Sequence, residues 1–474
     1  MRTDIDRGGT RRVVAAAAIL LLVAAPAPTQ EPTRDFYNVL LPDGADPWVY
    51  RHTDGTYYMT ATTGANITLR KSSSLSGIGG GETRVIWKPP ASGPASRNLW
   101  APELHYLNKK WYVYFAADDG ENENHRMFVL ENDSPDPFRG EFVNRGKVSD
   151  PKADRWAIDG TVLELGDRLY LIWSGWEGDE NVRQNLYIAP LKDPLTLGGP
   201  RVEISRPTLP WECVGKPHVN EGPQIIIRGD TINLVYSASG SWTDDYCLGL
   251  LTSKVGSDPL KPESWKKHDK PVLRSGGGVF GPGHASFTRS PDGKEDWIVY
   301  HAARFSGAGW TRNVRAQPFT WNKDGTPSFG SPVRPDQPIA LPGGDPPRRR
   351  YEAEHAVLGG KARAGKHAGA SNGEAVGGVE TAESRIDFAV SVPDAGTYLV
   401  AVRFAKAAAK NREATHRISV NGNEVGTIRY PSSGGDSWSN ALRALELRAG
   451  KNTIRLSGGN GVATIDSLDV VLRK

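Results

Sequence analysis

The sequence predicts an all-β protein, namely a five-bladed β-propeller followed by a β-sandwich of the jelly-roll type. Three observations lead to this prediction: a hairpin pattern that recurs five times, a composition rich in glycine and tryptophan with little helical patterning, and a second set of alternating strands near the C-terminus. The chain has 474 residues, with 53 Gly and 14 Trp. This length accommodates two domains, and we expect the propeller over residues 35–340 and the sandwich over 351–474.

The repeated hairpins share an apolar, aromatic strand that follows a polar turn. These strands begin at Tyr57, Trp111, Leu169, Ile232 and Trp297. Another short apolar strand precedes each turn, so the repeating unit is a β-hairpin. The copies recur roughly every 55 to 65 residues, which is the spacing of four-stranded propeller blades with variable outer loops.

An ionisable residue stands at the head of the first strand of each hairpin. In order these residues are Asp46, Glu103, Asp159, Glu221 and His284. Equivalent positions on the innermost strands of a propeller face the central channel, so we expect all five side chains to meet there. A single one of them could be an ordinary turn carboxylate, but five in one phase indicate a functional site. Carboxylates in a confined space repel one another, which raises pKa values.

Paired carboxylates are the chemical requirement of glycoside hydrolysis. One protonates the leaving oxygen, and the other activates water or attacks directly. Glutamate suits the acid role because its intrinsic pKa is slightly higher and its side chain is longer. The residues alone supply candidates and leave their roles open.

The motifs around these residues resemble the ordered motifs of glycoside hydrolase family 43, a family of five-bladed propellers. They are Asp46-Pro47-Trp48, Trp100-Ala101-Pro102-Glu103, Ile158-Asp159-Gly160, Glu221-Gly222-Pro223 and Gly283-His284, and the resemblance spans residues 35 to about 340. It implies that Asp46 is the general base, that Glu221 is the general acid, and that Asp159 tunes and orients the acid. It also implies inversion of the anomeric configuration.

The same resemblance suggests further substrate contacts. It implies that Arg315 contacts substrate and that His284 contacts a central water or a metal ion; the alternative is a buried, hydrogen-bonded histidine. We expect Glu103 to join the substrate site, and Trp100 either to stack on a sugar or to pack in the core. Glu212, which precedes Cys213, is a rival acid, because it resembles the Glu-Cys pair of invertase-like propeller hydrolases. It lies outside the repeat phase, so Glu221 is preferred.

The C-terminal region reads as a separate β-sandwich. Residues 331–350 are rich in proline and predict a stiff, extended linker. The ends of the following region resemble carbohydrate-binding modules of families 6 and 35. That resemblance implies a structural calcium ion held by Glu352, Glu354 and Asp466. Calcium prefers carboxylate oxygens as ligands, which fits these residues. It also places Trp438 and Asn460 in ligand-binding loops, although Trp438 could equally be core packing.

Composition and the N-terminus restrict the remaining function classes. The net charge of +4 is spread along the chain, so we expect no nucleic-acid partner. Residues 1–30 resemble a secretory signal, and no segment is long enough to span a membrane. We therefore expect a secreted, extracellular monomer. Cys213 and Cys247 predict a disulfide, with two buried thiols as the alternative.

Taken together, the sequence predicts a secreted exo-acting α-L-arabinofuranosidase that needs no cofactor for its chemistry. The expected partner is a plant cell-wall polysaccharide, arabinan or arabinoxylan. β-Xylosidase and endo-arabinanase activities would use the same three carboxylates. A non-catalytic sugar-binding propeller is the alternative from another class, and the presence of all three carboxylates argues against it.

Overall fold

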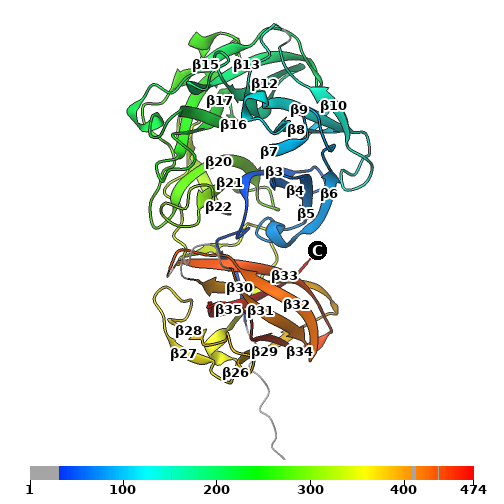
Figure 1. The fold of residues 1–474 in the computed structure, drawn as a ribbon, viewed down its shortest axis with the longest axis vertical. Coiled ribbons are helices and arrows are strands. Elements are labelled where there is room, and N and C mark those ends of the chain that lie inside the picture. The colour runs from blue at the N-terminus through cyan, green and yellow to red at the C-terminus, as the bar shows by residue number, and fades with distance from the viewer. Residues whose placement is uncertain (1–30, 151, 407–412, 436, 474) are drawn as a thin grey trace, which may run out of the picture.

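The computed structural model describes residues 31–150, 152–406, 413–435 and 437–473. It contains a five-bladed β-propeller, followed by a β-sandwich that packs against one side of it (Figure 1). The expected signal segment, residues 1–30, lies outside the described residues. No helix in the described ranges has the length and apolar character needed to cross a bilayer.

Each blade is an antiparallel sheet whose strands follow one another in the chain. The first blade contains β3 (Ala45–Arg51), β4 (Tyr57–Thr62), β5 (Ile67–Ser72) and β6 (Glu82–Trp87), and the second contains β7 (Arg97–Leu107), β8 (Lys110–Asp118), β9 (Arg126–Asn132) and β10 (Val143–Lys147). The third contains β11 (Ala157–Leu165), β12 (Arg168–Gly175), β13 (Arg183–Asp193), β14 (Thr196–Leu197) and β15 (Val202–Ser205). The fourth contains β16 (His218–Arg228), β17 (Thr231–Ala238), β18 (Cys247–Lys254) and β19 (Lys266–Lys267), and the fifth contains β20 (Phe280–Arg289), β21 (Asp296–Ala303), β22 (Arg312–Trp321) and β23 (Pro327–Ser328). A short parallel pairing between β13 and β16 joins the third and fourth blades.

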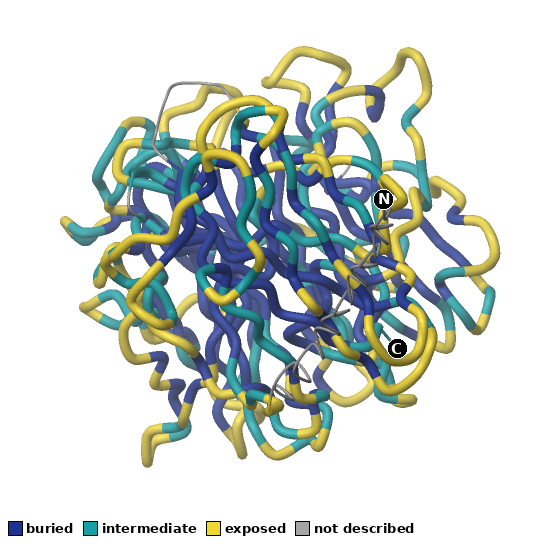
Figure 2. The backbone as a smooth tube through the Cα atoms, turned by 90° about the horizontal axis from the view of Figure 1, so that it is seen from below, coloured by how far each residue is buried: buried dark blue, intermediate teal, exposed yellow. Residues whose placement is uncertain are grey.

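Five apolar clusters fill the spaces between neighbouring blades, one for each of the five contacts around the ring. The last of these contacts, between the first and fifth blades, closes the ring and contains Val49, Met59, Trp297 and Val314. Each blade is therefore buried on both faces. This double burial explains why the second strand of each hairpin is a continuous apolar run rather than an alternating one. Figure 2 shows the buried residues concentrated in the interior.

The segment 331–350 is not a free spacer, in contrast to the stiff linker expected from its prolines. Its strand β24 (Pro338–Ala340) pairs with β2 (Asp35–Tyr37). Asp345 accepts hydrogen bonds from the backbone N–H groups of Leu75 and Ser76. The segment is therefore attached along its length to the first blade and to the N-terminal strand.

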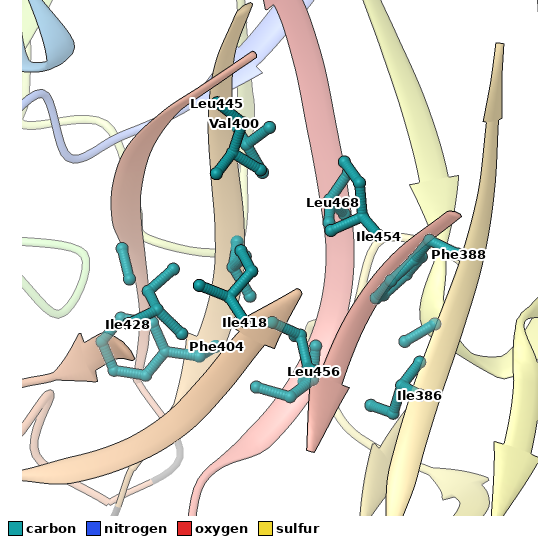
Figure 3. Close-up of a cluster of buried hydrophobic side chains, with 14 of the residues drawn as sticks. Ile386, Phe388, Val400, Phe404, Ile418, Ile428, Leu445, Ile454, Leu456 and Leu468 are labelled. Carbon is teal, nitrogen blue, oxygen red and sulfur yellow. The ribbon is translucent and has the colours of Figure 1, made fainter. Parts of the chain in front are cut away.

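The C-terminal region is a sandwich of two sheets. One contains β1 (Pro32–Thr33), β25 (Arg348–Glu352), β35 (Thr464–Leu472), β28 (Glu374–Gly377), β27 (Arg363–Lys366), β30 (Gly396–Ala405) and β33 (Trp438–Leu447); the other contains β26 (Val357–Gly359), β29 (Arg385–Val392), β34 (Gly450–Ser457), β31 (Ala414–Val420) and β32 (Asn423–Tyr430). Their inner faces enclose one apolar core that includes Phe388, Phe404 and Leu456 (Figure 3). Alternating burial along β29 is the pattern of a strand with one solvated face.

The described helical segments are single 3₁₀ turns in loops. They are η1 (Ile78–Gly80), η2 (Asn122–Asn124), η3 (Pro210–Glu212), η4 (Pro262–Ser264) and η5 (Ala353–His355). The sandwich and the propeller are in direct contact near Tyr37. The Arg403 guanidinium lies 3.8 Å from the centroid of the Tyr37 ring, and Asn440 donates a hydrogen bond of 2.7 Å to the Tyr37 carbonyl.

Candidate active site

The innermost strand of every blade carries the same irregularity. In β3, β7, β11, β16 and β20, two residues stand opposite one residue of the neighbouring strand, so each strand has a β-bulge. The first residue of one bulge in each strand has a positive φ: Asp46 (52°), Ala101 (42°), Asp159 (59°), Gly222 (53°) and His284 (43°). The strands β7 and β20 carry a second bulge as well. A bulge changes the direction of its side chain relative to a regular strand. The repeat therefore turns these five positions in the same way.

The prediction that five ionisable residues share one phase is correct for Asp46, Asp159 and His284 and wrong for the two glutamates. Glu221 lies one residue before the bulge position of its strand, which Gly222 occupies. Glu103 lies two residues after its bulge position. The positive φ at 222 and the 3.1 Å approach that a Cβ there would make to the His284 ring both favour glycine at this position.

Despite this offset, Asp46, Asp159, Glu221 and His284 line a single cavity of about 790 Å³ at the axis of the propeller. The rest of its lining comes from loops and strand ends of all five blades: Ala45, Thr62, Trp100, Asn122, Trp156, Ile158, Asn181, Gln184, Lys216, Pro217, Ser241, Trp242, Trp310 and Arg312. Stretches of chain that are far apart in sequence thus form one concave site, as expected from the repeat.

Asp46 is surrounded by cationic and hydrogen-bonding groups. Its Oδ1 lies 3.2 Å from His284 Nδ1 and 3.6 Å from Arg312 Nη1, and its Oδ2 accepts a hydrogen bond of 2.6 Å from the Thr62 hydroxyl. Burial alone would raise the pKa of Asp46. His284, His301 and Arg312 outweigh burial and hold the pKa well below its usual range. Asp46 is therefore a carboxylate at neutral pH.

Asp159 and Glu221 form the opposite case, a pair of buried acids with raised pKa values. Burial raises the pKa of Asp159 to about 8, and repulsion from Glu221 and Asp46 adds to this effect although His284 opposes it. Burial also raises the pKa of Glu221, against a hydrogen bond of 2.8 Å that the Tyr246 hydroxyl donates to Glu221 Oε1. Both acids therefore hold a proton more tightly than a free carboxyl group does, whereas Asp46 loses its proton more readily.

Two histidines lie next to these carboxylates. Burial would lower the pKa of His284, but the neighbouring carboxyl groups, above all that of Asp46, outweigh burial and raise it, so His284 favours the cationic form more than a free imidazole does. Burial and Arg312 lower the pKa of His301 to about 3. The neutral His301 ring accepts a hydrogen bond of 3.0 Å from the Asp46 backbone N–H at Nδ1. His301 thereby fixes the backbone of Asp46.

Trp100 reaches the cavity and is stacked on a buried histidine. Its ring centroid lies 3.9 Å from that of His125, and the two planes are 25° apart. His125 Nδ1 lies 3.0 Å from Asp118 Oδ2, and His125 Nε2 lies 3.1 Å from the Asn98 carbonyl oxygen. One face of Trp100 is therefore supported by a fixed imidazole, in a position that suits stacking on a sugar.

Two residues predicted to contact substrate do not line this cavity. Glu103 is buried and forms hydrogen bonds with Gln224 and His105. Arg315 donates to the Val333 carbonyl and contacts Tyr300, on the side of β22 away from the cavity. Arg312, three residues earlier, is the arginine beside Asp46. A pattern of arginines on one strand could not show which of them lies at the cavity end.

Glu212, the rival acid, has a structural environment. It is fully buried, lies 2.8 Å from Lys267 Nζ, and accepts hydrogen bonds from Tyr236, Asn220 and the backbone at Thr208 and Leu209. It does not line the cavity. Its contacts fix the loop ahead of β16.

The predicted disulfide is wrong, since Cys213 and Cys247 are both free thiols. Cys247 is buried in the cluster between the third and fourth blades, and its Sγ faces the carbonyl oxygens of Ala238 and Trp211 at 3.8 Å and 4.0 Å. Cys213 is half-buried on the loop after η3. The Cys247 thiol is thus turned toward backbone acceptors, and burial raises its pKa to about 12.

In the sandwich, Trp438 does not form an exposed stacking surface. Its side chain is 3% exposed, its Nε1 donates to the Ala368 carbonyl, and the Arg403 guanidinium lies 4.5 Å from its ring centroid. Trp438 instead lines a second cavity, of about 660 Å³, between the sandwich and the propeller. Asn460 is exposed and pairs through its backbone with Thr415.

The expected calcium ligands are close together but already partly engaged. The Ser371 hydroxyl contacts both Glu352 and Asp466, and Asp466 also forms an ion pair of 2.6 Å with Arg403. Burial and repulsion from Asp466 and Glu354 raise the pKa of Glu352 to about 7, and Glu354 Oε2 is buried without a hydrogen-bond partner. These two glutamates suit a cation, whereas Asp466 is neutralised by Arg403. Among the described residues no group of three His, Cys, Asp or Glu side chains is arranged to hold a metal, near His284 or here.

The aromatic walls of the cavity went unrecognised in the sequence. Trp156 stacks on Trp176 with centroids 4.9 Å apart, and Trp242 meets Trp310 edge to face at 6.1 Å. Fourteen tryptophans were a signal that such surfaces exist. Trp156, Trp176, Trp242 and Trp310 all lie in loops outside the repeated strands, so the repeat did not identify them.

Comparison with known proteins agrees with this geometry. Residues 36–327 match the family model described as glycosyl hydrolases family 43, and residues 349–473 match the model described as carbohydrate binding module (family 35). The chain is 40% identical over 314 residues to an extracellular exo-alpha-(1->5)-L-arabinofuranosidase of Streptomyces avermitilis, an alignment that covers 64% of each chain. It is 38% identical over 288 residues to the enzyme of the same description from Streptomyces chartreusis, which covers 60% of this chain and 86% of the relative.

A solved structure shows the same propeller. The alpha-L-arabinofuranosidase from Lactobacillus brevis superposes with a TM-score of 0.60 at 38% identity, covering 63% of this chain and 97% of that one. The family match includes all three carboxylates of the cavity, Asp46, Asp159 and Glu221. The chain therefore belongs to glycosyl hydrolase family 43.

Proposed function

We propose that this protein is a secreted, inverting exo-α-L-arabinofuranosidase that removes terminal arabinose from plant cell-wall arabinan or arabinoxylan. One observation carries the proposal: Asp46, whose pKa is lowered, lines the same cavity as Asp159 and Glu221, whose pKa values are raised. A hydrolase that acts by one displacement needs a base and an acid that are ready at the same pH.

Asp46 is the general base in this proposal. Its carboxylate accepts a proton from the attacking water, so the negative charge needed at the start of the reaction is present at neutral pH. His284 and Arg312 maintain that charge, and the Thr62 hydroxyl and the His301 contact fix the orientation of the carboxylate. Because this site is buried, the electrostatic effect of both cations is stronger than it would be in water.

Glu221 is the general acid. It donates its proton to the glycosidic oxygen as the bond to the leaving sugar breaks. The Tyr246 hydroxyl donates to Oε1, which leaves Oε2 to carry that proton. Asp159 accepts a hydrogen bond of 3.0 Å from the N–H of Gly222, which immediately follows the acid, so Asp159 orients Glu221 through the backbone. Burial and the charge of Asp46 raise the proton affinity of Glu221.

The sugar specificity is supported by the relatives. Two of them, at 40% and 38% identity, are described as extracellular exo-alpha-(1->5)-L-arabinofuranosidases. Matches described as probable arabinan endo-1,5-alpha-L-arabinosidases are more distant, at 29% to 30% identity. The alignments span 64% of the length of the first relative, so its activity supports the proposal for this chain without deciding it.

The C-terminal sandwich serves in this proposal as a carbohydrate-binding module that keeps the enzyme at its polymer. A calcium ion held by Glu352 and Glu354 would neutralise their repulsion, and Asn372 and Ser371 would complete their surroundings. The residues 1–30 would direct secretion, which agrees with the extracellular relatives. The catalytic steps require no cofactor, because both proton transfers use protein carboxyl groups.

Product analysis tests this function directly. Purified enzyme is incubated with debranched arabinan, arabinoxylan and the 4-nitrophenyl glycosides of α-L-arabinofuranose and β-D-xylose, while ¹H NMR follows the anomer released. We expect monomeric arabinose of inverted configuration and cleavage of the arabinofuranoside. Release of xylose alone, or of internal oligosaccharides, would replace this specificity with that of a β-xylosidase or an endo-arabinanase. Absence of any cleavage would favour a sugar-binding propeller.

A further inference from the structure

Trp310 stands out because it is a large aromatic residue at the catalytic cavity whose side chain is mostly in solvent. It is 68% exposed, yet it lines the same cavity as Asp46 and Glu221. It lies in the loop 304–311 between β21 and β22, two residues before Arg312. A single exposed apolar residue is common on protein surfaces and by itself needs no function. The question is whether this indole is free or fixed.

The indole of Trp310 is fixed by neighbouring groups. Its Nε1 donates a hydrogen bond of 3.1 Å to the Ser241 hydroxyl, and its ring meets that of Trp242 edge to face. The Ser241 carbonyl accepts a second hydrogen bond, of 2.8 Å, from Arg312 Nη2. Ser241 therefore joins the exposed indole to the arginine that lies beside Asp46.

The loop that carries Trp310 is attached at its other end as well. Asp244 accepts hydrogen bonds from the Ser306 hydroxyl and from the Gly307 N–H. Trp242 in turn packs closely on backbone, since a Cβ on Gly240 would come within 2.7 Å of its ring. Four hydrogen bonds thus connect the loops of the fourth and fifth blades into one wall. Orienting this wall in advance reduces the entropy that a ligand must pay on binding.

We infer that Trp310, supported by Trp242 and Ser241, forms a binding subsite for a sugar on the leaving-group side of the cleaved bond. This inference rests on the proposed function and extends it. The terminal sugar occupies the buried part of the cavity beside the carboxylates, so the rest of the chain must leave through its mouth. The exposed indole face offers the apolar surface that the face of a sugar ring covers.

The test compares substrates that do and do not reach this subsite. kcat and KM are measured for methyl α-L-arabinofuranoside, whose methyl aglycone is too small to reach the indole, and for a 1,5-linked arabinotetraose, with the full-length protein and its Trp310→Ala, Trp310→Phe and Ser241→Ala variants. For Trp310→Ala we expect kcat/KM on the tetrasaccharide to fall about tenfold, mainly through KM, and to stay within about twofold on the methyl glycoside.

The other variants separate the ring from its support. Trp310→Phe keeps an aromatic face and should recover much of the loss in kcat/KM on the tetrasaccharide. Ser241→Ala releases the indole, so its kcat/KM should lie between those of the wild type and Trp310→Ala. Ile227→Ala, a change at an exposed residue on the outer part of β16, is the control and should behave as wild type.

Two results would overturn the subsite. One is an equal loss on both substrates, which would assign Trp310 to the catalytic centre; the other is unchanged kinetics on the tetrasaccharide. Failure of the wild-type enzyme on both arabinosides would refute the proposed function instead. The same comparison of methyl glycoside with tetrasaccharide, on whichever sugar the enzyme does cleave, then decides the subsite by the same two criteria.

Discussion

Replacing Asp159 by asparagine should stabilise the protein at neutral pH while it impairs catalysis. Asp159 is 4% exposed and faces Glu221 and Asp46, which is why its pKa rises from about 3.8 to about 8. An acid with a raised pKa binds its proton more tightly in the folded state than in the unfolded state. Folding stability therefore falls as the pH rises from the unfolded pKa toward the folded one. Asparagine has the same shape and no proton to lose, so it removes this dependence.

The size of the effect follows from the shift. At pH 7 the acid is ionised in the unfolded state and protonated in the folded state. Each pH unit between the unfolded pKa and pH 7 contributes up to about 1.4 kcal/mol, and there are roughly three such units. The free energy of unfolding should therefore rise by on the order of 2 to 4 kcal/mol in the variant. For a domain of this size that corresponds to roughly 4 to 8 °C in Tm. The asparagine side-chain oxygen can still accept the Gly222 N–H, so the local backbone should persist.

Thermal melts from pH 4 to pH 8, followed by circular dichroism, measure this effect. We expect Asp159→Asn to melt above wild type at pH 7.5 and the difference to shrink toward zero near pH 4, while kcat drops at every pH. Asp167→Asn, in the exposed turn between β11 and β12, is the matched control and should leave both the Tm and its pH dependence unchanged. An Asp159→Asn variant that is less stable than wild type at pH 7.5, by the same amount as at pH 4, would refute this electrostatic reasoning.

Three further predictions follow from the site and its surroundings. Arg312→Lys should lower kcat/KM by about tenfold or more with little change in Tm, whereas Arg315→Lys should lower Tm and leave kcat near wild type; the reverse pattern would contradict the placement of the two arginines. Mass spectrometry of the non-reduced protein should show two free thiols at Cys213 and Cys247, and a reductant should not change the Tm; a mass 2 Da lower would contradict this. Calcium should raise the Tm of the wild type, and chelation should reverse this increase. Glu354→Gln should abolish the response, whereas the control Glu424→Gln, at an exposed position, should keep it. A wild-type Tm that does not respond to calcium would contradict the proposed ion.

The repeat predicted the fold from sequence because its signal is strong and local. Continuous apolar runs such as Trp111 to Phe115 reflect burial on both faces of a blade, and their spacing gave the number of blades. The same reasoning brought Asp46, Asp159 and His284 to one cavity. It could not predict which exact residue of each strand faces the channel. A bulge shifts by one residue which side chains face that way, and the sequence pattern does not reveal the bulge. Glu221 and Glu103 are offset from the shared position for this reason.

Contacts that depend on tertiary packing were less predictable. Arg312 and Arg315 are three residues apart on one strand, and only the placement of β22 shows that Arg312 is at the cavity. For Trp438 the sequence left ligand binding and core packing equally open, and the structure covers its ring with Arg403 and neighbouring backbone. Two cysteines in a secreted chain favour a disulfide on composition alone, but the packing of Cys247 between two blades orients its thiol toward carbonyl oxygens.

We propose above all that Glu221 protonates the leaving group in a cavity it shares with Asp46 and Asp159. The most direct measurement is kcat on arabinotetraose for Glu221→Gln and Glu212→Gln, well below the Tm of each variant. Both are buried glutamates of the same blade, but only Glu221 lines the cavity. We expect kcat to fall about 10²- to 10⁴-fold for Glu221→Gln and to stay within a few-fold of wild type for Glu212→Gln. Near-normal turnover by Glu221→Gln together with a collapse in Glu212→Gln would contradict the claim.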